Sequence, residues 1–180
     1  MFDVNLCPLE GCLEVVFNQK NDNRGHFIKS FHEPEFKKIG IEMNFKEEYF
    51  TYSHKNVFRG LHFQNPPNAI AKMVYCVMGE VIDFVVDIRL NSPTFGEWHS
   101  FELSGDRPSV VFVPIGFAHG FYVTSTNALM QYKVSDLFDP VCDSGIDYKS
   151  FPFADEIINP IISERDQSFV KFQDYKSLFI

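Results

Sequence analysis

An arginine and a histidine lie three positions apart in the apolar segment NVFRGLHFQNPP, and these two side chains could perform chemistry. Arg59 carries a permanent charge that suits phosphate oxygens, whereas His62, with an ordinary pKa of about 6.5, accepts a proton near pH 7. Gly60 stands between them, and a glycine inside a strand often marks the close approach of a ligand or of a neighbouring backbone. The alternative is an edge strand with a solvent-exposed arginine and a histidine of the core.

A further histidine follows a turn in FVPIGFAHGF, where Pro114, Gly116 and His119 have the spacing Pro-x-Gly-x-x-His. This spacing resembles the second motif of the cupin superfamily of small β-barrels, in which metal-binding members use the histidine as a ligand. Zinc and iron sites need three or four protein ligands, and the sequence contains no His-x-His pair. We therefore expect a barrel without a metal or another cofactor, which performs acid–base chemistry.

The segments that must position these residues are short, alternate between polar and apolar side chains, and are separated by turn residues. Glycine or proline stands in the connections MGE, NSPTFG, SGDRP and VPIG, where the chain reverses. Many short strands with regular turns are typical of a sandwich or barrel. The predicted strands cover residues 13–18, 25–31, 48–52, 57–63, 71–78, 81–89, 97–103, 109–113, 120–124 and 128–134.

Helix is scarce in this sequence. One short helix is predicted over residues 33–39, ending at Gly40. The tail over residues 150–180 is less regular, and we expect it to pack over the barrel as loop and short helix. No repeat or linker divides the chain, so we predict a single domain over residues 1–180 with its core at about 13–149.

The composition is that of a globular protein, with 45% hydrophobic and 22% charged residues, and its 21 Phe and 7 Tyr favour strands. A formal charge of −8 argues against nucleic acid as a partner. The sequence shows no secretion signal, and no apolar run approaches the ~20 residues that span a bilayer. The four cysteines, Cys7, Cys12, Cys76 and Cys142, form no C-x-x-C pair. We therefore expect reduced thiols and a cytoplasmic location.

The order of several motifs resembles the dTDP-4-dehydrorhamnose 3,5-epimerase family and, more broadly, epimerases of nucleotide-linked 4-keto sugars. The motifs are RGLHFQNPPNAIAKMVYCVMGEVIDFVVDIRLNSPTFGEW, VFVPIGFAHGF and QYKVSDLFDP, and the similarity extends from NRGHF to ISERD. The resemblance implies an all-β fold, a cupin-type double-stranded β-helix (jelly-roll) barrel with short peripheral helices. It also implies a homodimeric isomerase without cofactor that acts on a nucleotide-diphosphate sugar in the synthesis of bacterial surface polysaccharide.

A 4-keto group acidifies the protons on C3 and C5, so inversion needs a base on one face, an acid on the other and a group that holds the enolate oxygen. By resemblance, His62 is the base, Lys72 faces the keto oxygen and Tyr132 is the acid. The resemblance also assigns Asp166 to the far nitrogen of the histidine, with Asp83 as the alternative. Without the resemblance, Lys72 is interpreted as a lysine that extends to the barrel rim and Tyr132 as a core residue. Asp166 is then interpreted as a solvated loop acid or a helix cap.

The expected substrate-binding residues surround this catalytic group. Arg24 and Arg59 are expected to clamp the diphosphate, because guanidinium groups suit phosphate oxygens, and Gly60 is expected to let the ligand approach. The other expected binding residues are Lys29, Glu47, Tyr49, His119, Phe138 and Asp143.

The departures from the family pattern concentrate where the nucleotide would bind. Glu47 and Tyr49 replace a usual Gln-x-Asn, Lys29 replaces an acid, Ile70 a glutamine and Phe138 a tyrosine. An ionised Glu47 could accept from the exocyclic amine of guanine. We therefore predict a GDP-linked 4-keto-6-deoxy-heptose as substrate, and otherwise dTDP-4-keto-6-deoxyglucose.

Three functions stay open at this point: epimerisation at C3, C5 or both, a 3,4-ketoisomerase, and a non-catalytic sugar-binding barrel. Retention of His62, Lys72 and Tyr132 favours the epimerase. We further expect a homodimer in which the strand over 13–18 adds to the exposed sheet edge of a neighbour.

Overall fold

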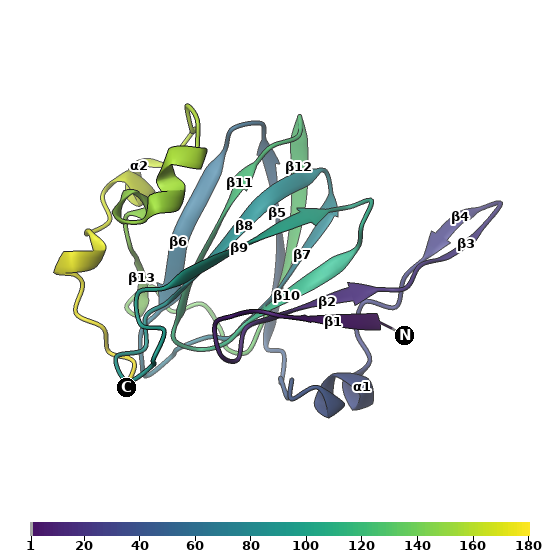
Figure 1. Cartoon of the computed structure of the whole chain (residues 1–180), viewed down its shortest axis with the longest axis horizontal. Helices are drawn as coiled ribbons and strands as arrows, with labels where there is room; N and C mark the ends of the chain where they lie inside the picture. Colours follow the sequence, from purple (N-terminus) through teal and green to yellow (C-terminus); the bar gives the residue numbers. More distant parts are fainter. Residues whose placement is uncertain (1) are drawn as a thin grey trace.

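A computed structural model describes residues 2–180 and contains two antiparallel β-sheets that form the barrel (Figure 1). One sheet has six strands, in the order β1 (Phe2–Leu6), β2 (Leu13–Phe17), β10 (Ser109–Val113), β7 (Lys72–Met78), β12 (Asn127–Val134) and β5 (Glu47–His54). The other has five, in the order β13 (Asp143–Gly145), β6 (Phe58–Gln64), β11 (Phe117–Val123), β8 (Glu80–Asp87) and β9 (Trp98–Ser104). The predicted all-β class with few helices is confirmed.

The main core lies between the two sheets. Side chains alternate across a strand, so every second residue of a strand points to this core. Val74 and Met130 of the six-stranded sheet pack in one cluster with Val85 and Phe121 of the five-stranded sheet, and all four are fully buried. The two sheets are therefore held together by side chains whose positions follow from period-two patterning.

A second apolar cluster covers the outer face of the five-stranded sheet. Phe84 of β8 stacks on Phe153 with ring centroids 4.3 Å apart, and Phe58 of β6 contacts Tyr148 at 4.5 Å. Phe153 belongs to the C-terminal tail and Tyr148 lies just before it, so this part of the chain covers β6 and β8 on the outer face of the sheet. The short helix η1 (Tyr148–Ser150) leads into the tail, which contains η2 (Pro152–Glu156), α2 (Glu164–Gln167) and η3 (Phe172–Asp174).

The helix α1 (Glu33–Lys38) covers part of the outer face of the six-stranded sheet. Its first turn carries a proline and two acids and its last turn two lysines, an arrangement that suits the helix dipole. Phe36 of this helix is buried against Phe17 and Tyr75 of the sheet. On the same sheet, Phe50 and Tyr52 of β5 stay exposed.

The N-terminal region differs from the prediction. β2 pairs with β1 on one edge and with β10 on the other, so the expectation that this strand adds to a neighbouring copy is wrong. The strand predicted over 25–31 is shorter, because β3 (Lys20–Asp22) and β4 (Gly25–Phe27) form a separate hairpin that projects away from the barrel (Figure 1). The strands β1, β3 and β13 were not predicted.

Two glycines bring β6 and β11 unusually close together. A Cβ atom on Gly60 would lie 2.5 Å from Cα of Gly120, and Gly60 also has a φ of +143° that side chains disfavour. Near this contact, His62 is paired directly with His119 across the two strands. The expectation that Gly60 admits the ligand is therefore wrong, because its missing side chain makes room for the neighbouring backbone.

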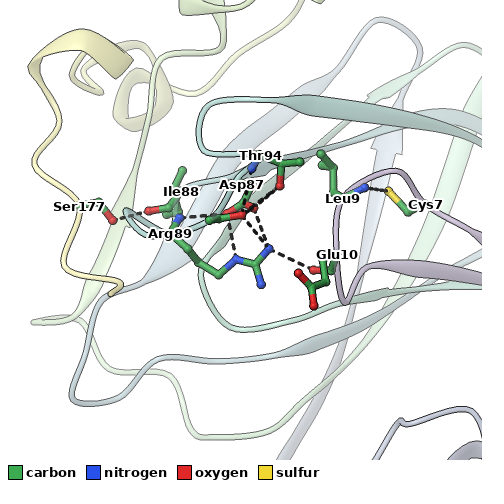
Figure 2. A network of polar contacts seen from close by, with 9 residues as sticks. Cys7, Leu9, Glu10, Asp87, Ile88, Arg89, Thr94 and Ser177 are labelled. Carbon is green, nitrogen blue, oxygen red and sulfur yellow. Dashed lines mark hydrogen bonds and ion pairs between the residues drawn. The ribbon is translucent and has the colours of Figure 1, made fainter.

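A polar network ties three distant segments together (Figure 2). The buried carboxylate of Asp87 accepts from Arg89 Nη2 at 2.7 Å and from the hydroxyl of Thr94 at 2.7 Å. Arg89 also donates to the carbonyl of Glu10 at 3.0 Å, and the hydroxyl of Ser177 donates to the carbonyl of the residue between Asp87 and Arg89. Burial alone raises the pKa of Asp87, but these hydrogen bonds hold it below its ordinary value.

All four cysteines carry free thiols, as the sequence predicted, and Cys12, Cys76 and Cys142 are buried. Within residues 2–180, no helix combines the length and the apolar character that crossing a membrane requires.

Candidate active site

A cavity of about 400 Å³ contains most of the predicted catalytic and binding side chains. The two sheets contribute to it from opposite walls, since β6 and β11 supply His62 and His119 while β7 and β12 supply Lys72 and Tyr132. The predicted residues that line it are Tyr49, Arg59, His62, Lys72, His119, Tyr132, Phe138 and Asp143. Lining residues outside the predicted set include Thr51, Gln64 and Arg165.

His62 is paired with a carboxylate from the C-terminal tail. Its Nε2 lies 2.9 Å from Oδ1 of Asp166, whose Oδ2 accepts from the backbone N–H of Gly60 at 3.1 Å. A carboxylate at Nε2 favours the tautomer that carries hydrogen there and leaves Nδ1 to accept a proton. Burial, together with nearby Lys72 and Arg165, lowers the pKa of His62 although Asp166 opposes the change. His62 is therefore neutral at pH 7, as a general base must be.

The short helix α2 holds Asp166 in place. The Ser163 side chain caps this helix by accepting from the backbone N–H of Asp166 at 3.1 Å. Burial on its own raises the pKa of Asp166, but the hydrogen bonds from His62, Gly60 and Ser163 outweigh it and lower the pKa. The carboxylate stays ionised at neutral pH. Asp166 is thus neither a solvated loop acid nor itself the helix cap.

A second His–Asp pair lies in the same cavity. Nε2 of His119 is 2.8 Å from Oδ2 of Asp83, and both side chains are almost fully buried. Burial raises the pKa of Asp83, while His119 and Lys72 oppose the rise. The other oxygen of Asp83, Oδ1, has no hydrogen-bond partner among residues 2–180. In this structure Asp83 therefore pairs with His119, and Asp166 is the carboxylate that pairs with His62.

Lys72 brings a positive charge close to His62. Its Nζ donates to the backbone carbonyl of His62 at 3.1 Å, and its side chain is buried. Burial lowers the pKa of Lys72 to about 8, against the opposing pull of Asp143 and Asp83. At pH 7 most of the lysine is still protonated, so a cation is available beside His62 to stabilise a negative oxygen.

Tyr132 faces the cavity from the wall opposite to His62. Burial raises the pKa of its phenol well above the ordinary value, and Tyr49 and Asp83 add to the rise. The phenol therefore keeps its proton at neutral pH and has a proton to donate. A neutral imidazole that can accept a proton and a phenol that can give one thus stand on two sides of one cavity.

Two arginines supply further positive charge. Arg59 Nε donates to Ser53 Oγ at 3.0 Å, which fixes the guanidinium at the cavity wall. Arg165 forms an ion pair of 2.5 Å with Asp143, and sequence reasoning missed it. Arg165 directly precedes Asp166 in the segment ISERD, and neighbouring residues of a short helix lie close together in space. The sequence therefore contained a signal that Arg165 lies near the cavity if Asp166 does. In a chain of net charge −8, these cations make a local site for an anion.

A smaller cavity of about 210 Å³ adjoins the first and shares Tyr49, Gln64, Ile70 and Phe138 with it. Glu47 and Asp136 bring carboxylates to its wall. Oε2 of Glu47 accepts from the backbone N–H of Phe138 at 2.9 Å, which leaves Oε1 for another donor. Aromatic rings with polar groups at the wall suit a flat heterocycle.

Two predicted binding residues lie apart from both cavities. Arg24 stands at the tip of the β3–β4 hairpin with its side chain 85% exposed, and it pairs with Asp22 at 2.6 Å. Lys29 lines a different cavity with Asn18, Lys20 and Phe27. Among residues 2–180, no group of three or more His, Cys, Asp or Glu side chains is placed to hold a metal ion.

Comparisons with known proteins agree on one family. The family model described as dTDP-4-dehydrorhamnose 3,5-epimerase matches residues 7–174. A curated relative of that name from Shigella flexneri is 39% identical over 165 residues, which cover 89% of this chain and 91% of the relative.

Solved structures of the same kind superpose closely. The enzyme of this name from Bacillus anthracis, with TDP and PPi bound, has a TM-score of 0.90 at 29% identity and covers 95% of this chain and 99% of its own. A dTDP-6-deoxy-D-glucose-3,5-epimerase from Legionella pneumophila, in complex with dTDP-4-keto-L-rhamnose, has a TM-score of 0.89 at 32% identity, covering 98% and 95%.

Proposed function

The chain belongs to the dTDP-4-dehydrorhamnose 3,5-epimerase family, a family of isomerases, and we propose that it inverts C3, C5 or both in a 4-keto-6-deoxy sugar linked to a nucleoside diphosphate. The observation that carries this proposal is the placement of His62 and Tyr132 on opposite walls of one cavity, with Lys72 beside the base. Inversion needs proton removal on one face and proton delivery on the other, and these side chains stand where the two steps require them.

In the proposed reaction, Nδ1 of His62 takes the proton from the carbon next to the ketone. The C–H bond breaks, and its electron pair becomes the enolate, whose oxygen is stabilised by the Lys72 ammonium group. Tyr132 then gives its phenol proton to the opposite face of the same carbon. His62 loses its proton to solvent and the tyrosinate regains one, so the cycle needs no oxidant and no reductant.

The diphosphate is proposed to bind the positive end of the cavity. Arg59 and Arg165 supply guanidinium groups there, and such groups suit phosphate oxygens. Arg24 cannot join them within one chain, because its hairpin projects away from the barrel (Figure 1). We propose that it reaches the cavity of a second copy in a homodimer, where it completes the diphosphate site.

An apolar stripe on the six-stranded sheet supports the proposed dimer. We define the stripe as Phe50, Tyr52 and Met78, whose exposed fractions are 72%, 49% and 46%. Tyr52 of β5 and Met78 of β7 both pair with Leu129 of β12, so they flank this residue in one row across three strands. Contiguous apolar surface of this kind is typical of a protein–protein interface.

We expect sedimentation analysis to show a dimer at micromolar concentration and the Phe50→Asp variant to dissociate about tenfold or more readily. A carboxylate placed in an apolar interface loses its hydration without gaining a partner. Ile158→Asp is the matched control, because Ile158 is 66% exposed on the tail, away from the stripe, and its replacement should leave the dimer intact. A monomeric wild type, or a Phe50→Asp variant that dimerises normally, would contradict this arrangement.

For the nucleotide we propose thymidine, as in the names of the relatives, with the base against Phe138 in the smaller cavity. A GDP-linked sugar, the heptose derivative predicted from the sequence, is the second candidate. The carboxylates of Glu47 and Asp136 favour it, because they can accept hydrogen bonds. Guanine offers an exocyclic amine next to a ring N–H, whereas thymine has no exocyclic amine.

Incubation in deuterated water tests both the reaction and the nucleotide. We expect wild-type protein to incorporate solvent deuterium at C3, at C5 or at both in dTDP-4-keto-6-deoxyglucose, and to do so faster than in GDP-linked 4-keto sugars. NMR then locates the label, and mass analysis counts it. Faster labelling of a GDP sugar would establish the second candidate. No label in any of these substrates would refute the epimerase, and migration of the ketone from C4 to C3 would indicate a ketoisomerase.

A further inference from the structure

Tyr49 is in direct contact with the proposed acid. It is paired with Tyr132 across β5 and β12, so the two side chains point to the same face of the sheet. Their rings are stacked, with centroids 4.8 Å apart and an angle of 18° between the planes. By the resemblance stated in the sequence analysis, Tyr49 stands where the family pattern usually has asparagine.

Two aromatic rings pack against Tyr132. The edge of His119 meets it at 6.2 Å with an interplanar angle of 76°, and His119 is itself held by Asp83 at 2.8 Å. Tyr49 supplies the other contact, and 38% of its surface is exposed. His119 is thus held by its carboxylate partner, whereas Tyr49 is a ring that substrate can also touch, because it lines both cavities.

Both phenols are neutral under physiological conditions. Burial, with help from Glu47 and Asp143, raises the pKa of Tyr49 to about 12. The stacked ring therefore brings no charge to Tyr132 at neutral pH. What it offers is a flat apolar face, and stacked aromatic pairs contribute about 0.5–1.5 kcal/mol beyond their buried area.

We propose that Tyr49 is a positioning residue for Tyr132: its ring fixes the direction of the Tyr132 hydroxyl and so decides how much of the enolate is protonated from that side. This inference rests on the proposed epimerisation. An enolate that Tyr132 does not reach in time receives a proton from His62 on the original face, which returns the substrate with a solvent-derived hydrogen. A loosely held Tyr132 should therefore lower inversion more than it lowers exchange.

The test compares inversion with deuterium incorporation in Tyr49→Leu, Tyr49→Asn and Tyr49→Phe. We expect the first two variants to invert the substrate about 10–100-fold more slowly, the scale expected for a misplaced catalytic group, while exchange falls much less. Tyr49→Phe keeps the stacking ring and should restore the wild-type ratio. A role in substrate binding alone would raise KM and lower both rates together, and this result would overturn the inference.

Two other results are decisive as well. Equal ratios in all variants and wild type would show that the stack does not direct the acid. A Tyr49→Phe variant that behaves like Tyr49→Leu would assign the effect to the Tyr49 hydroxyl and also refute the proposal. Failure of the proposed function looks different, because the wild type would then neither exchange nor invert any 4-keto nucleotide sugar.

Discussion

The His62→Asn variant should lose deuterium exchange at both ring carbons, with a rate about 10²–10⁴-fold below that of the wild type. Asparagine occupies similar space and forms hydrogen bonds, but it does not take up a proton at neutral pH. Lys72 and Tyr132 stay in place, so the cavity keeps its cation and its acid while the step that forms the enolate is missing. Exchange is followed by NMR in deuterated water with saturating substrate.

Two measurements separate loss of the base from loss of the fold or of the ligand. His99→Asn is the matched control, because His99 lies on β9 and does not line the cavity, so this variant should exchange at the wild-type rate. Calorimetry should show that His62→Asn still binds the nucleoside diphosphate. Exchange at the wild-type rate in His62→Asn would assign the base to another group, with His119 the nearest candidate.

The Tyr132→Phe variant should separate exchange from inversion. The ring and its stacking on Tyr49 are kept, so binding changes little, but no hydroxyl remains to deliver a proton. His62 can still remove a proton, exchange it with solvent and return it to the same face. We expect inversion to fall about 10²–10⁴-fold, while deuterium still enters the substrate at a much larger fraction of the wild-type rate.

Tyr122→Phe is the matched control for this variant. Tyr122 lies on β11 outside the cavity, and its hydroxyl donates to Asn56 and to the carbonyl of Ile158. Losing this hydroxyl should affect stability without changing the ratio of inversion to exchange. If exchange and inversion instead fall by the same factor in Tyr132→Phe, then Tyr132 acts in enolate formation or in shaping the cavity, and the two-face mechanism is wrong.

The barrel was predictable because its strands are defined locally. β10 was predicted with its observed ends, and β6 was displaced by one residue, since alternation and turn residues both lie within each segment. β1 carried the same signal, because Phe2, Val4 and Leu6 alternate with polar residues, and it was overlooked. β13 carries no such signal, as the segment DSG becomes a strand only through its pairing with β6.

The site was predictable only in part, because some of its contacts join residues far apart in the chain. His62, Lys72 and Tyr132 stand in recognisable motifs on strands that face the barrel interior. Asp166 lies 104 positions from His62, and no local pattern reveals that the two meet. The charge of Arg24 was evident, but its direction depends on a hairpin that leaves the barrel, which period-two patterning does not describe.

The origin of Asp166 in the tail has a consequence for biosynthesis. Ribosomes make the chain from its N-terminus, and Asp166 follows every strand of the two sheets described here. The sheets can therefore close while the growing chain still lacks the carboxylate that pairs with His62. Until the tail docks, the outer face of the five-stranded sheet also exposes Phe58 and Phe84, which is the kind of surface that chaperones bind. One late docking step thus hides the aggregation-prone face and completes the His–Asp pair.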